Sequence, residues 1–118
     1  MKNFSETDMK IKVAEAVQNY GQKDYQKDTE FLDEIHKTFK CCGLEGADDF
    51  KGFSLKPTAE SNYFASSGDP KSCFDNKNNL WKRGFKEAIE YVPTLIKAIN
   101  ILILLLTFLL LVNSNRYL

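Results

Sequence analysis

The chain has 118 residues, which is enough for one small domain together with a short hydrophobic segment. About ninety residues outside that segment can bury only a modest core, so a covalent cross-link would be useful. Sixteen basic and sixteen acidic side chains cancel to a formal net charge of zero, which argues against a nucleic-acid-binding protein, because that class carries a basic excess.

Residues 4–20 predict an amphipathic helix that ends at Gly21. Apolar side chains recur there at helical spacing, and charged or amide side chains fill the other face. The apolar positions are Phe4, Ile11, Ala14 and Val17, with Met9, Val13, Ala16 and Tyr20 beside them. This face should lie against a second helix.

That second helix is predicted to begin at Asp28, a plausible N-cap, and to run to Lys40. Its apolar stripe consists of Phe31, Leu32, Ile35 and Phe39. His36 lies at the edge of this stripe, and we expect it to be an ordinary solvated or partly packed residue. The two helices should pack on each other through their apolar faces.

Residues 48–73 lose the helical period and mix Gly, Pro, Ser and Asp, which predicts an irregular loop with at most one or two short helical turns. Asp48 and Asp49 are expected to be solvated turn residues rather than an acid/base pair. Isolated aromatic residues lie at Phe50, Phe53, Tyr63 and Phe64. We expect two of them to cover the core and the others to bind a partner protein.

Residues 81–91 predict a last helix of the soluble part, with Pro93 as a kink or junction into the apolar segment. The uncharged residues 98–112 form about 22 Å of helix, and residues 92–112 form about 31 Å, close to the hydrocarbon thickness of about 30 Å. Lys97 can extend its ammonium group to the headgroups. A buried core helix would need a polar face, and Thr107 is the one polar residue between Ile101 and Val112. Residues 92–112 therefore predict a transmembrane helix.

No hydrophobic region follows Met1 over residues 2–8, so we expect no signal peptide. Two alternatives follow. The chain is either part of a larger membrane protein or a tail-anchored protein whose domain faces the cytosol.

Three cysteines occur, two of them adjacent at Cys41 and Cys42, and the third at Cys73. Adjacent cysteines cannot bond each other without strain, so each needs a partner elsewhere. A zinc site made from His36 and the three cysteines is disfavoured, because adjacent thiolates fit one tetrahedron poorly and the usual ligand spacings are missing. With one histidine and no recognisable nucleophile motif, the sequence predicts no enzyme and no cofactor.

Cys41-Cys42-Gly43, followed by a loop and then Pro70-Lys71-Ser72-Cys73 before a hydrophobic helix, resembles the tetraspanin family. The similarity covers the large extracellular loop (residues 1–91, with a variable partner-binding part at 44–72), the fourth transmembrane helix (92–112) and a short cytoplasmic tail (113–118). The fold class implied is all-α: an antiparallel helical stalk with a disulfide-stapled irregular loop, followed by one transmembrane helix.

The resemblance also implies a Cys42–Cys73 disulfide. The family usually has Gly-Cys near the start of the last helix, paired with the first cysteine of the C-C-G motif, and here that dipeptide is Gly84-Phe85. Cys41 is therefore expected to be unpaired, with the Phe85 ring buried where the second bridge would have been. Asn3 lies in an N-x-S pattern and is a candidate glycosylation site if this part is extracellular.

By resemblance, the expected function is that of a non-enzymatic scaffold that organises membrane protein complexes through its extracellular loop, in the plasma membrane. Its expected partners are the lipid bilayer and other membrane proteins, including tetraspanins, with no nucleic acid and no small-molecule substrate. The alternative is a tail-anchored interaction protein that faces the cytosol and keeps its cysteines reduced.

Overall fold

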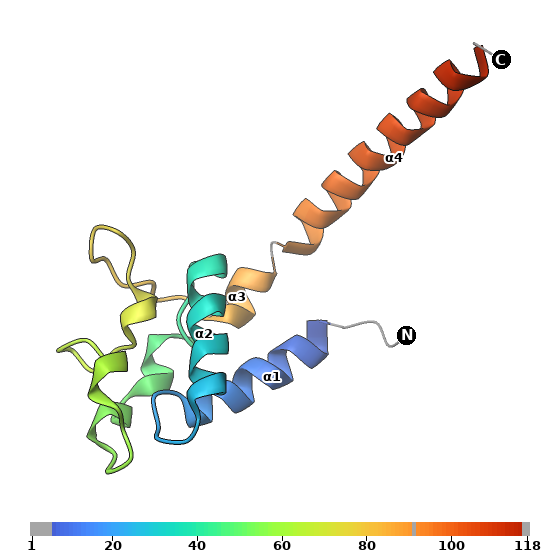
Figure 1. Cartoon of the computed structure of the whole chain (residues 1–118). Helices are drawn as coiled ribbons and strands as arrows, with labels where there is room; N and C mark the ends of the chain where they lie inside the picture. The colour runs from blue at the N-terminus through green and yellow to red at the C-terminus, as the bar shows by residue number, and fades with distance from the viewer. Residues whose placement is uncertain (1–5, 91, 117–118) are drawn as a thin grey trace.

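The computed structural model describes residues 6–90 and 92–116, and over these residues the fold is helical with no β-strand (Figure 1). The all-α prediction is confirmed. The α-helices are α1 (Glu6–Asn19), α2 (Gln26–Phe39), α3 (Phe85–Ile89) and α4 (Val92–Arg116). The 3₁₀ helices are η1 (Ala47–Phe50), η2 (Phe53–Leu55), η3 (Ser61–Tyr63) and η4 (Lys71–Cys73).

Helix α1 packs on α2 through one face, as the sequence predicts. Its buried residues are Val13, Ala16 and Val17, and Tyr20 follows them in the turn. Ile11, which the sequence places on the same face, is 54% exposed and lies outside the buried stripe. Phe4 falls outside the described residues.

Helix α2 begins earlier than predicted, at Gln26, with Tyr25 as the N-cap residue. Asp28 is therefore not the cap. It lies inside the first turn, where its carboxylate accepts a hydrogen bond from the Asn19 side-chain amide at 2.8 Å. The helix ends at Phe39, one residue before the predicted end at Lys40, which is the C-cap residue and has a left-handed conformation. The Arg83 guanidinium donates to the carbonyls of Phe39 and Lys40.

The helix predicted over residues 81–91 is shorter than expected, because α3 spans Phe85–Ile89 alone. The preceding residues are extended: the Trp81 N–H donates to the Cys73 carbonyl, and the Arg83 carbonyl accepts from the Cys42 N–H. Because Trp81 and Arg83 form these hydrogen bonds with the two bonded cysteines, this segment does not form the predicted helix. Helix α4 begins one residue before Pro93, so the break coincides with the predicted junction and proline occupies the first turn, which it favours.

Helix α4 projects away from the other elements (Figure 1). Its large apolar side chains from Ile101 to Leu111 are 53–70% exposed. Within the part of the chain that the structure describes, no helix is both long enough and apolar enough to cross a membrane. The transmembrane helix at residues 92–112 stays a prediction.

The loop after the C-C-G motif contains four 3₁₀ helices, more than the one or two helical turns predicted. It lies on the opposite side of α1 and α2 from α4 (Figure 1). It also rests on the turn between these two helices. The Lys23 N–H donates to the Thr58 carbonyl at 2.7 Å, and the Glu60 N–H donates to the Gly21 carbonyl at 2.7 Å.

Candidate functional site

A disulfide between Cys42 and Cys73 lies in the buried core of the domain. Both residues are fully buried, and the bond joins the segment after α2 to η4 across a sequence separation of 31. This is the pairing that the family resemblance implies. The bond closes the loop that carries the four 3₁₀ helices and brings its two ends to one point.

Cys41 is a buried free thiol. Its Sγ lies 3.8 Å from the Ile35 carbonyl oxygen, and burial raises the pKa of the thiol to about 11, so the reactive thiolate is disfavoured. Phe85 belongs to the same core and is fully buried, with its ring edge-on to the Phe39 ring at 5.2 Å. The Phe85 ring is thus buried, as expected, and its filling the place of a second bridge stays a prediction.

His36 differs from its prediction, because it is fully buried rather than solvated or partly packed. Its Nε2 lies 2.9 Å from the Gly43 amide nitrogen, and its Nδ1 lies 2.8 Å from the Ser72 hydroxyl. An amide N–H can only donate, so Nε2 must be the unprotonated acceptor and Nδ1 carries the proton. Burial lowers the pKa of His36 to about 3, in keeping with a neutral imidazole.

The hydrogen-bond chain continues beyond His36. The Ser72 hydroxyl bonds the Tyr20 phenol, whose O–H donates to the Asp33 carboxylate at 2.6 Å. Burial first, and then the Asp33 carboxylate, raise the pKa of Tyr20. We call His36, Ser72, Tyr20 and Asp33 the His36 chain; Asp33 is half-buried and the other three are buried. The His36 chain connects the end of α1, helix α2 and η4 beside the disulfide.

The sequence did not lead us to predict the His36 chain. A signal for it was present, because His36 follows Ile35 and lies one helical turn after Leu32, on the face that packs inward. Ser72 precedes Cys73, so the disulfide itself places that hydroxyl at the histidine.

His36, Cys42 and Cys73 form the one group of potential metal ligands among the described residues, with their ligand atoms within 4.8 Å of one another. Cys41, the fourth member of the set considered from sequence, is not part of it. The two sulfur atoms are bonded to each other, and the histidine nitrogen facing them carries a proton. A metal needs thiolates and a free nitrogen lone pair, so this cluster is a structural junction.

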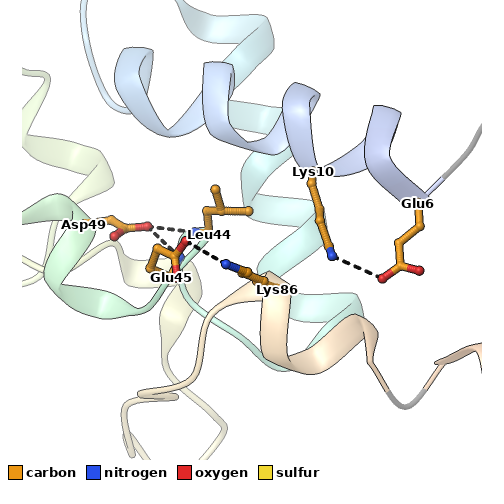
Figure 2. Close-up of polar contacts among 6 residues, drawn as sticks. All are labelled: Glu6, Lys10, Leu44, Glu45, Asp49 and Lys86. Atoms are coloured by element: carbon orange, nitrogen blue, oxygen red, sulfur yellow. Dashed lines mark hydrogen bonds and ion pairs between the residues drawn. The ribbon is translucent and has the colours of Figure 1, made fainter.

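Asp48 and Asp49 do not form an acid/base pair. Asp48 is exposed, whereas the Asp49 carboxylate accepts from the N–H groups of Leu44 and Glu45 at 2.8 and 3.0 Å (Figure 2). These bonds fix the turn that follows Gly43. Figure 2 also shows the ion pairs Lys86–Glu45 at 3.5 Å and, within α1, Lys10–Glu6 at 3.3 Å.

The four loop aromatics divide into two classes. Phe50 and Phe64 are buried, with Tyr20 edge-on to their rings at 5.1 and 5.7 Å. Two of the four were expected to cover the core, and these two are therefore removed from the set of partner-binding candidates. Phe53 and Tyr63 are half-buried. Sequence reasoning missed Leu55, which is 86% exposed.

A protein-family model described as the Tetraspanin family matches residues 1–117. The chain belongs to the tetraspanin family. No curated protein and no solved structure matches it. Membership supports a general role for this tetraspanin as a membrane scaffold, since members of the family are generally non-enzymatic. Asn3, the candidate glycosylation site, lies outside the residues that the structure describes.

Proposed function

We propose that this tetraspanin organises membrane protein complexes by binding partner proteins through residues 44–72. The observation that carries the proposal is the Cys42–Cys73 disulfide, which closes these residues into one loop. A loop with its ends joined has fewer conformations to lose when a partner binds, so more of the contact energy remains as affinity.

Contacts between the loop and the turn that joins α1 to α2 restrict the loop further. Besides the two backbone bonds to the α1–α2 turn, the Gln22 side chain accepts from the Thr58 hydroxyl at 2.7 Å and donates to the Phe53 carbonyl at 3.4 Å. Gly21, with φ +68°, sits where a Cβ would collide with the Phe64 ring, so the loop core and the turn approach closely. The loop is thus anchored to the α1–α2 turn at Phe53, Thr58 and Glu60.

We propose that α4 lies in the plasma membrane, with residues 1–91 outside the cytosol and residues 113–118 inside. Family membership and the exposed apolar side chains of α4 support this arrangement. The disulfide weighs against the tail-anchored, cytosol-facing alternative, because disulfides persist outside the cytosol and rarely within it.

Exchanging residues 46–72 for those of a paralogue should transfer partner choice to the chimera. Because α1 and α2 pack mainly on each other, helicity by circular dichroism should change little. Co-purification of the chimera with each parent's partner measures the transfer. If partner choice follows α4 in the reciprocal exchange, the loop is not the recognition element.

In sealed microsomes, residues 6–90 should resist added protease when the chain is expressed behind three preceding membrane helices. The physical reason is that a loop in the lumen is shielded by the bilayer. Detergent should abolish the protection. Digestion of this part without detergent would favour the cytosol-facing alternative.

A further inference from the structure

The most exposed large apolar side chain within residues 6–90 is that of Leu55, at 86%, followed by Ile11 at 54% and Tyr25 at 47%. Leu55 lies in the segment Lys51–Lys56, which contains η2 and which we call the cationic tip. A single exposed leucine is common on protein surfaces. Leu55 differs from such residues because its backbone is ordered and two lysines flank it.

The backbone of the cationic tip is ordered by its own hydrogen bonds and by a hydrogen bond from the Gln22 side chain. Gly52, with φ +80°, is the N-cap residue of η2, and its carbonyl accepts from the Leu55 N–H at 3.2 Å. The Phe53 carbonyl accepts from the Lys56 N–H at 3.2 Å as well as from Gln22. The Phe53 ring is edge-on to buried Phe50 at 5.7 Å. Leu55 is therefore presented to solvent on a fixed turn.

Two cations flank this leucine. The Lys56 ammonium lies 3.8 Å from the centroid of the Phe53 ring, an interaction that holds its charge beside the tip. Lys51, at the other end, is exposed. A groove of about 400 Å³ adjoins the tip, and Asp48 and Asp69 line it together with Lys51 and Leu55. Within the tip itself the charged side chains are Lys51 and Lys56, so residues 51–56 carry a positive charge, whereas Asp48 and Asp69 lie outside them.

We propose that the cationic tip inserts Leu55 into an apolar socket ringed by carboxylates on a partner protein. This inference rests on the proposed function and names the chemistry of the partner. A buried apolar residue surrounded by charges at the rim is the usual anatomy of a protein interface. The rim charges select an acidic partner and speed association.

A lipid surface fits the tip less well than a protein socket does. Membrane association scales with buried apolar area, and even a full acyl chain gives marginal, reversible binding, whereas the tip offers one leucine. The Phe53 ring is already engaged by Lys56 and Phe50. In Figure 1 the loop also lies on the side of the domain opposite α4.

The test begins with a photoreactive diazirine side chain at Pro57, an exposed residue next to the tip, in the full chain on cells. The crosslinked partner segment is identified by mass spectrometry and expressed, and its affinity for the full chain is measured. We expect Leu55→Ser and the pair Lys51→Glu with Lys56→Glu each to weaken binding at least tenfold. The matched control, Asp48→Lys with Asp69→Lys, should leave the affinity unchanged or raise it.

Three outcomes overturn the inference. One is crosslinking to lipid, together with Leu55-dependent binding to vesicles of phosphatidylserine and phosphatidylcholine. A second is weaker binding in the aspartate variants instead of the lysine variants, which would indicate a basic partner. The third is transfer of partner choice with residues 46–72 while the tip variants bind normally, in which case the proposed function stands and the cationic tip is not its contact. If the exchange transfers nothing, the proposed function fails as well.

Discussion

Replacing Cys42 or Cys73 with alanine is expected to lower the free energy of unfolding by about 3–4 kcal/mol, the entropic value for a closed loop of this length. The bond constrains 31 residues of sequence separation in the unfolded chain. Ser72 and Gly43 are the sequence neighbours of the two bonded cysteines, and both hydrogen-bond to His36. Loss of the disulfide therefore also weakens the hydrogen bonds of His36.

Cys41→Ala is the matched control, because Cys41 is equally buried but has no disulfide partner. Removing its sulfur should cost about 1 kcal/mol, the order of a small packing loss. Urea denaturation of the full-length variants under non-reducing conditions measures all three. If Cys41→Ala is as damaging as Cys42→Ala, the pairing of the cysteines is different from the one described.

The sequence was most informative where one face of an element is buried. The stripe of Leu32 and Ile35 predicted α2. The predicted end at Lys40 is one residue beyond the observed end at Phe39, because Lys40 is the left-handed C-cap residue. The start was missed since Asp28 looks like a cap, whereas Thr29 supplies the bonds at this turn. Its N–H and its hydroxyl both donate to the Tyr25 carbonyl, and its hydroxyl also accepts from the Gly21 N–H.

The loop was less predictable for a physical reason. Each 3₁₀ helix spans three or four residues, which is too short for any hydrophobic period. Their positions depend on bonds to distant segments, such as those from the α1–α2 turn to Thr58 and Glu60. The conformation of Trp81 also depends on a distant segment. Its spacing predicts a helix, but its N–H donates a hydrogen bond to the Cys73 carbonyl.

Lowering the pH from 7 to 5 is expected to reduce the free energy of unfolding by about 2 kcal/mol through His36 alone. Burial lowers the pKa of His36 from 6.5 to about 3 in the folded chain. Below pH 6.5 the unfolded chain therefore binds a proton that the folded chain does not. Stability from this group is complete above pH 6.5 and is lost progressively as the pH falls toward 3.

The composition makes this effect separable, because the chain has a single histidine and carboxylates titrate mainly below pH 5. Urea denaturation at pH 7 and pH 5 measures the difference. In His36→Gln the loss between the two pH values should fall below about 0.5 kcal/mol, since glutamine does not titrate. Ser72→Ala removes the partner of Nδ1–H but leaves the Gly43 N–H on Nε2, so this variant should be less stable at both pH values and keep most of the pH dependence. A wild-type chain equally stable at pH 7 and 5 would mean that protonation is accommodated, and hence that the Gly43 bond does not fix the imidazole in its neutral form.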